Sequence, residues 1–192
     1  MTKDKIIAIA IALFAKNGYE GTTLAEIAKG VGIQKPSIYN HFKNKEEIFL
    51  TIYKKILWSH IEDVRRLMER IKEETSEEQL RQIMLLTAQD YIDDEEKTTF
   101  LRRAVVFPPE SLKELVNEEF LLSEEALSAI LRSIFTQGIE AKEIREENIE
   151  DLIIAYYCLL DGIFIELSFY GAEKMVPRLQ NIWKIFWAGI SN

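Results

Sequence analysis

The sequence predicts an all-α protein in which a small N-terminal three-helix domain precedes a larger helical bundle. Ile, Leu, Ala, Glu and Lys dominate the 192 residues, with only 4 prolines and 8 glycines. This mixture favours helix over strand. Apolar residues also recur at helical spacing, and capping residues or glycines separate the periodic stretches. We place the domain boundary so that residues 1–46 form the first domain and residues 47–192 the second.

Three short helical stretches define the first domain. An apolar face with helical period predicts a helix over residues 2–17. Thr23 and Glu26 have the spacing of a capping box and start a second helix. Glycines 30 and 32 then allow a sharp turn, and a third helix is predicted over residues 35–41.

The second domain is predicted as a series of longer helices. Asn44 and Glu47 form a capping signal at the start of an amphipathic helix of roughly seven turns. The stretches expected to follow it run over residues 76–91, 94–107, 123–138, 148–171 and 173–190. The second of these is stopped by Pro108 and Pro109.

Charge is divided unevenly along the chain, although the net charge of −8 is unusual for a protein that binds polyanions. Residues 1–45 hold seven lysines against three acidic residues, a net charge of +4, which leaves −12 for the remainder. A basic domain on an acidic body indicates that only the N-terminal domain faces a polyanion.

Composition also excludes several classes of protein. Cys158 is the single cysteine, so an internal disulfide and a cysteine-based metal site are excluded, and a reducing cytoplasm is the expected compartment. Only two histidines occur, there is no glycine-rich phosphate loop, and the acidic pairs stand at helix starts or exposed ends. We therefore expect no enzyme, no catalytic residue, no metal and no cofactor.

A secretion signal is an alternative interpretation of the N-terminus, because Lys3 and Lys5 precede the apolar run 6–15. Asp4 interrupts the positive charge, and no small-residue cleavage zone follows. The longest apolar runs are shorter than the roughly 20 residues that span a bilayer. We therefore expect no membrane partner.

The two short helices joined by a glycine turn have the layout of a helix-turn-helix. Ile38 and Phe42 are expected to pack inward with Ile33. The outward residues of the third helix are then polar or basic, and such side chains can hydrogen-bond base edges or phosphates. They are Gln34, Lys35, Ser37, Tyr39, Asn40 and His41.

Residues 6–49 resemble the DNA-binding domain of the TetR family of repressors. The resemblance rests on Ala10, Leu13-Phe14, Asn17-Gly18-Tyr19, Thr22-Thr23, Glu26-Ile27-Ala28, Val31-Gly32-Ile33, Tyr39, His41-Phe42 and Lys43-Asn44-Lys45-Glu46-Glu47. It implies that Thr23 and Lys45 contact phosphates, and that Gln34, Lys35, Pro36, Ser37 and Asn40 face the major groove. It further implies that Tyr39 and His41 contact the backbone. Many members have Ser or Thr in place of Gln34; because Gln is a poorer cap, its side chain is left free to contact a base.

The second domain is expected to bind a ligand and to form a homodimer. The helix over residues 148–171 is apolar almost all round and needs cover on every side, which a second copy in a four-helix bundle would provide. The expected interface residues are Leu152, Tyr156, Leu159, Ile163, Leu179, Trp183, Phe186 and Trp187. Two-fold symmetry would then place two recognition helices about one DNA turn apart, ~34–36 Å.

The candidate ligand pocket is rich in aromatic residues. Its expected lining is Trp58, Ile61, Glu62, Tyr91, Phe100, Phe107, Phe135, Tyr157, Asp161 and Phe164. With an acidic group in the lining, such a pocket suits a flat, lipophilic and cationic molecule.

The function predicted from the sequence is a repressor that a small lipophilic ligand releases from operator DNA. A ligand-binding helical module without DNA binding and an activator of the same fold stay open as alternatives.

Overall fold

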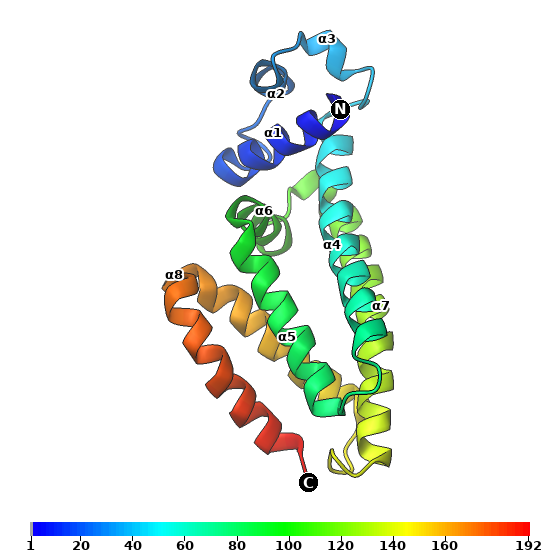
Figure 1. Ribbon diagram of the computed structural model, residues 1–192. Helices are drawn as coiled ribbons and strands as arrows, with labels where there is room; N and C mark the ends of the chain where they lie inside the picture. Colours follow the sequence, from blue (N-terminus) through cyan, green and yellow to red (C-terminus); the bar gives the residue numbers. More distant parts are fainter. Residues whose placement is uncertain (1) are drawn as a thin grey trace. The chain divides into compact units, whose positions relative to one another are not determined.

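The computed structural model describes residues 2–192 and is built from helices, with no β-strand in this range apart from an isolated bridge between Ile144 and Ser191 (Figure 1). The elements are α1 (Thr2–Asn17), α2 (Leu24–Val31), α3 (Lys35–Ile38), α4 (Lys45–Arg70), α5 (Ser76–Asp93), α6 (Glu95–Val106), the 3₁₀ turn η1 (Glu110–Leu112), α7 (Lys113–Glu140) and α8 (Ile149–Ile190). The all-α prediction is confirmed.

The chain divides into two packing units that differ from the two predicted domains. Unit 1 combines Met1–Ser59 with Asp94–Ser123, and unit 2 combines His60–Asp93 with Glu124–Asn192. Unit 1 therefore holds α6 as well as the three short helices. The boundary at residue 46 followed the local periodicity, which contains no sign that α6 packs against α1.

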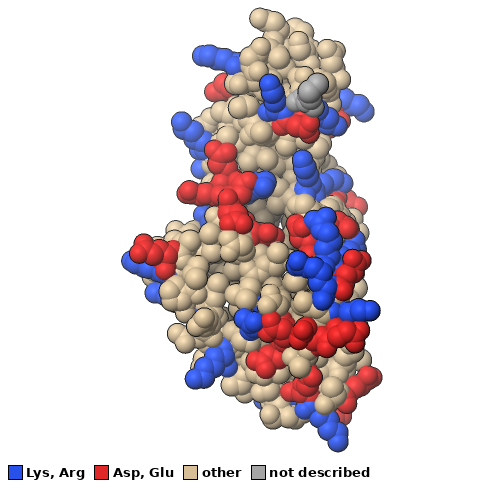
Figure 2. All heavy atoms as spheres, in the orientation of Figure 1, with Lys and Arg blue, Asp and Glu red and all other residues tan. Residues whose placement is uncertain are grey.

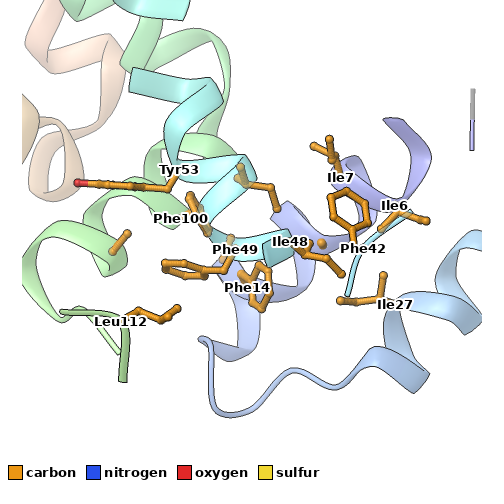
Figure 3. Close-up of a cluster of buried hydrophobic side chains, with 14 of the residues drawn as sticks. Ile6, Ile7, Phe14, Ile27, Phe42, Ile48, Phe49, Tyr53, Phe100 and Leu112 are labelled. Carbon is orange, nitrogen blue, oxygen red and sulfur yellow. The ribbon is translucent and has the colours of Figure 1, made fainter. Parts of the chain in front are cut away.

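The core of unit 1 is a cluster of interlocking aromatic rings with isoleucines beside it. Phe14 of α1, Phe49 of α4 and Phe100 of α6 are all buried, and their ring centroids lie 5.0–6.1 Å apart. Figure 3 shows these rings converging from three helices, with Ile6, Ile27 and Ile48 extending the cluster toward α2. The expected inward face of the first helix, which includes Ile6 and Phe14, is confirmed. This core fixes the short helices to the start of α4.

Helix caps appear where capping residues were predicted. The Asn44 side chain accepts a hydrogen bond from the Glu47 N–H at 2.8 Å and begins α4, while the Glu47 carboxylate accepts from the Lys43 N–H at 2.6 Å. Asn148 accepts from the N–H groups of Glu150 and Asp151 at the start of α8. One predicted helix start is wrong: α7 runs unbroken from Lys113, so Ser123 lies inside a helix.

Unit 2 is held together by α8, which bends at Gly171. This glycine has φ +70°, so two helical segments meet there, close to the predicted break (Figure 1). The Tyr156 hydroxyl donates to the Leu80 carbonyl of α5 at 2.6 Å, and the Trp183 indole N–H donates to Glu77 at 3.4 Å. Both halves of α8 thus pack on their own chain.

That packing leaves much of the predicted dimer interface, which stays a prediction, with little free surface. Five of its residues are buried within the protomer: Leu152, Tyr156, Ile163, Leu179 and Trp183. Leu159, Phe186 and Trp187 are partly exposed. The sequence showed that α8 is apolar on most faces, but periodicity does not show which face the same chain covers.

Helix α8 is also long and apolar enough, by length and composition alone, to cross a membrane, although the apolar runs in the sequence are short. Its apolar residues include much of the unit 2 core, and Gly171 and Pro177 interrupt its regular geometry. Core packing therefore accounts for a large part of its apolar character.

Candidate nucleic-acid interface

Helix α3 presents a polar outer face supported by one buried anchor. Ile38 is fully buried, whereas Tyr39 is 52% exposed. The other predicted contact residues are accessible to differing degrees: Gln34, Lys35, Pro36 and Asn40 are exposed, and Ser37 and His41 are partly exposed. The surface that sequence reasoning assigned to DNA is thus open to solvent, with side chains able to donate and accept hydrogen bonds.

The recognition helix is shorter than predicted. Helical geometry covers only Lys35–Ile38, and the chain continues to His41 as turns stabilised by hydrogen bonds back to the Ile38 carbonyl. The Gln34 side chain makes no cap hydrogen bond, although Gln34 occupies the N-cap position. Its amide is therefore free to contact a base edge, as the weak capping ability of Gln indicated.

Thr23 forms the predicted capping box. Its hydroxyl accepts from the Glu26 N–H at 3.2 Å, and the Glu26 carboxylate accepts from the Thr23 N–H at 2.8 Å and from the Thr23 hydroxyl at 2.7 Å. These hydrogen bonds lower the pKa of the Glu26 carboxyl. A phosphate contact by Thr23 stays a prediction. It would use the same hydroxyl that forms the capping box at the start of α2.

Lys45 connects the start of α4 to the loop before α2. Its ammonium donates to the carbonyl oxygens of Tyr19 at 2.7 Å and Thr22 at 3.0 Å. It also lies 4.0 Å from the centre of the Tyr19 ring. The resemblance assigned Lys45 to phosphate alone, but the structure adds a role in fixing the α1–α2 loop.

Two further residues support the interface, and the sequence analysis assigned a role to neither of them. Thr22 is fully buried and its hydroxyl donates to the Gly18 carbonyl at 2.8 Å, which closes the loop between α1 and α2. Arg103 of α6 donates to the Lys16 carbonyl at 3.4 Å, near the end of α1. No local signal marks Arg103, because its partner lies 87 residues away in the sequence.

Charges on the visible face agree with the uneven distribution along the chain. Figure 2 shows scattered lysines with few acidic side chains over α1–α3, and denser mixed clusters of acidic and basic side chains over the remaining elements. Basic side chains beside a polar helix face attract phosphate groups at long range.

In unit 2 the structure brings together four of the predicted ligand residues. The rings of Tyr91 and Phe164 lie 4.7 Å apart, and the Tyr157 hydroxyl lies 2.9 Å from the Ser128 hydroxyl and donates to the Glu124 carbonyl at 2.8 Å. Desolvation raises the pKa of the Asp161 carboxyl. Desolvation and the charge of Asp161 also raise the pKa of Tyr91 and of the Glu124 carboxyl, so these acidic groups lie near one another. We call Tyr91, Glu124, Tyr157, Asp161 and Phe164 the acidic aromatic cluster.

The other predicted ligand residues do not gather in one unit. Phe100 belongs to the aromatic core of unit 1, and Trp58 donates to Glu119 at 2.6 Å in the same unit. Phe107 is 79% exposed. Glu62 was expected in the pocket lining, but it is exposed on α4 and pairs with Arg65 at 2.5 Å. Ile61 and Phe135 are buried in unit 2, where Phe135 packs on Tyr156.

The described residues 2–192 contain no group of three His, Cys, Asp or Glu side chains arranged to hold a metal ion. The site consists of the exposed polar face of α3, the internal hydrogen bonds made by Thr23 and Lys45, and the lysines around them. Together these features define a helix-turn-helix protein with a helical C-terminal unit.

Comparison with known proteins specifies this class. Residues 6–52 match the sequence profile described as "Bacterial regulatory proteins, tetR family". Over 47 residues, the chain is 60% identical to the biofilm operon icaADBC HTH-type negative transcriptional regulator IcaR of Staphylococcus epidermidis. That match covers 24% of this chain and 25% of the relative, so the chain spans about a quarter of the length of this curated relative.

Solved structures extend the likeness to the whole fold. The regulator FadR of Bacillus subtilis, solved in complex with stearoyl-CoA, superposes with a TM-score of 0.80 at 24% identity, over 97% of this chain and 98% of FadR. FadR of Bacillus halodurans superposes with a TM-score of 0.79 at 17% identity, over 96% of this chain and 94% of that structure. The chain is thus similar to TetR-family transcriptional regulators, in sequence over residues 6–52 and in fold over nearly its whole length. These relatives are regulators and not enzymes, in agreement with the sequence analysis.

Proposed function

We propose that this protein is a dimeric transcriptional repressor that binds operator DNA through α3 and releases it when a small lipophilic ligand occupies unit 2. The observation that carries the proposal is the exposed polar face of α3 anchored by the buried Ile38. The negative regulator IcaR, at 60% identity in this region, supports repression as the direction of control. Binding to chromosomal DNA, together with a single unpaired thiol, supports the cytoplasm as the compartment.

The roles of the contact residues follow from their exposure. Gln34, Lys35, Pro36, Ser37 and Asn40 would face the major groove, and Tyr39 and His41 would contact the backbone beside it. Thr23 and Lys45 would contact phosphates with the donor capacity that their internal hydrogen bonds leave.

A dimer is supported by a stripe of exposed small and apolar residues on the first half of α8. Ile154, Cys158, Gly162, Ile165 and Phe169 are all exposed, and their spacing of three or four residues places them on one helix face. Large exposed apolar residues such as Phe169, at 77%, favour burial against another surface. We assign this stripe to the contact with a second copy, in place of the buried residues expected from the sequence.

The acidic aromatic cluster favours a lipophilic cation as the ligand. Asp161 is exposed and Glu124 half-buried, partial desolvation raises the pKa of both carboxyls, and the described residues offer neither of them a basic partner in an ion pair. A bound cation would restore the favourable ionised form of both groups and could stack on the Tyr91 and Phe164 rings. The stearoyl-CoA of the Bacillus subtilis FadR structure is an anionic alternative that the test must include.

The DNA part of the proposal is tested by fluorescence anisotropy with the duplex just upstream of the protein's own gene, across a range of salt concentrations. We expect salt-sensitive binding that Lys35→Ala and Tyr39→Ala each weaken about tenfold or more. Lys174→Ala, an exposed lysine of unit 2, is the matched control and should bind as the unaltered protein does. Absence of salt-sensitive binding to any duplex, with both variants inert, overturns the repressor assignment.

The ligand part is tested by thermal unfolding with a panel of lipophilic quaternary ammonium dyes and, separately, stearoyl-CoA. We expect the dyes to raise the melting temperature, and Asp161→Asn to reduce the rise. A rise with stearoyl-CoA alone, or no rise with any dye, refutes the cationic ligand.

A further inference from the structure

Unit 1 contains a cavity of about 460 Å³ that the proposed function does not use. It is lined by residues of α1, the α1–α2 loop, α4, α6 and the segment after α6, all within this unit. Its volume is within the range of small-molecule sites. We propose that this cavity binds a small aromatic carboxylate, as a second ligand site separate from the acidic aromatic cluster.

The apolar wall of the cavity consists mainly of aromatic residues. Phe14, Tyr19, Phe49 and Phe100 all line it, and neighbouring rings among them lie 5.0–6.1 Å apart. Figure 3 shows Phe14, Phe49 and Phe100 side by side in this part of the core. Phe14, Phe49 and Phe100 are buried against one another, so the ring surface left for a ligand comes from the half-buried Tyr19 and the exposed Phe107. These two rings favour an aromatic ligand over a flexible alkyl chain.

The charged part of the cavity selects an anion. Arg103 is the one charged residue among the lining residues given, and its side chain is exposed. Its guanidinium makes a long hydrogen bond of 3.4 Å to the Lys16 carbonyl, and among residues 2–192 no carboxylate pairs with it. A guanidinium has five donors in a planar fork, so it can keep that hydrogen bond and still bind a carboxylate through two others.

Two features of the chain hold the cavity open at its rim. Gly18 has φ +73°, which favours glycine, and a Cβ at this position would lie 3.1 Å from Arg103 Nη1, so the guanidinium would have to move by a few tenths of an ångström. Phe107 lines the rim while 79% exposed, an arrangement that costs free energy unless the ring is covered. A ligand ring stacked on Phe107 would provide that cover, with its carboxylate directed to Arg103.

The test is calorimetric titration of the full-length protein with 2-naphthoate, with neutral 2-naphthamide and cationic 2-naphthylmethylammonium as probes of the same shape. We expect the carboxylate to bind at least about tenfold more tightly than the amide, and the cation to bind more weakly still. Arg103→Met should reduce carboxylate affinity to that of the amide. Phe107→Ala should weaken the binding of both the carboxylate and the amide. Because Phe107 is exposed, we expect this substitution to leave the fold intact.

Matched controls are Arg66→Met, an exposed arginine of unit 2, and Val106→Ala, an exposed apolar residue of α6 outside the lining. Both should leave the titration unchanged. Amide chemical shifts of Gly18 and Phe107 should move with 2-naphthoate, and in Arg103→Met the same changes should need at least about tenfold more 2-naphthoate. Equal affinity for carboxylate and amide, unchanged affinity in Arg103→Met, or no binding at millimolar 2-naphthoate overturns the proposal.

Discussion

The ammonium group of Lys45 lies 4.0 Å from the centre of the Tyr19 ring and donates a 2.7 Å hydrogen bond to the carbonyl oxygen of the same residue. A second hydrogen bond reaches the Thr22 carbonyl at 3.0 Å. One side chain at the start of α4 thus fixes the whole loop between α1 and α2. The loop in turn sets where α2 begins, and so where the helix-turn-helix is placed on the core of unit 1.

Replacement of Lys45 by Met should therefore destabilise the protein. Met keeps the apolar stem but removes two charge-assisted hydrogen bonds and the contact with the ring, which together contribute about 1–2 kcal/mol at this partly exposed position. Urea denaturation would measure the loss. Lys43→Met is the control, because that exposed side chain makes no such contact, and it should change the stability by less than about 0.5 kcal/mol. Equal stability of the two variants would show that Lys45 has no part in holding the loop.

Gly18 ends α1 in a conformation that other residues adopt only at a cost. Its φ of +73° is in the left-handed region, and Arg103 leaves little space for a side chain. Gly18→Ala should lower the unfolding free energy by about 1–2 kcal/mol through backbone strain. Gly189→Ala is the comparison, since Gly189 is helical and a Cβ there meets no atom within 4 Å. The unfolding free energy of that variant, measured in a thermal or urea melt, should rise by up to about 1 kcal/mol. The same sign for both substitutions would contradict this account.

Local signals predicted most of the secondary structure and the outer face of α3. The Thr23–Glu26 capping box, the cap at Asn148 and the bend at Gly171 depend on residues a few positions apart, so the sequence contains the whole signal. The predicted helix start at Ser123 was wrong because serine is a common N-cap residue. The hydroxyl of Ser123 instead donates to the Phe120 carbonyl within a continuous helix.

Long-range packing was beyond the reach of the same reasoning. Phe100 was assigned to a ligand pocket, yet its ring lies 5.0 Å from Phe49 in the core of unit 1. Trp183 was assigned to a dimer contact, yet its indole is buried in unit 2 and reaches Glu77. An apolar helix face predicts that something covers it. Whether the cover is the same chain, a second copy or a ligand depends on topology, which periodicity does not record.

The exposed stripe on α8 should contain the residues on which dimerisation depends. Ile154→Glu combined with Phe169→Glu introduces two charges on this face, which a closely packed interface would have to desolvate. We expect the double variant to be monomeric in light scattering at micromolar concentration, with its helix content unchanged because both residues are exposed. Lys174→Glu is the control, because Lys174 is an exposed polar residue of α8 outside the stripe and its replacement changes no exposed apolar surface. A dimeric double variant would show that the second copy contacts another face.

Asp161 should make the protein less stable as the pH rises. Desolvation raises its pKa in the folded protein above the ordinary value of 3.8. Below that value the carboxyl is protonated in both folded and unfolded states and has no effect on stability. As the pH rises through the raised folded pKa, the folded protein must ionise a desolvated group, so the unfolding free energy falls. The cost is fully present once the pH is above the raised folded pKa.

Asp161→Asn removes this ionisation, so the variant should be more stable than the unaltered protein at pH 7. The difference should shrink as the pH falls and disappear below about 3.8, where Asp161 is neutral in both states. Urea melts at several pH values would measure it. Glu173→Gln, an exposed carboxyl of the same helix, should stay within about 0.5 kcal/mol of the unaltered protein. If Asp161→Asn were instead the less stable protein at pH 7, the carboxyl would have a favourable partner in the folded state, and the case for a cationic ligand in the acidic aromatic cluster would lose its electrostatic basis.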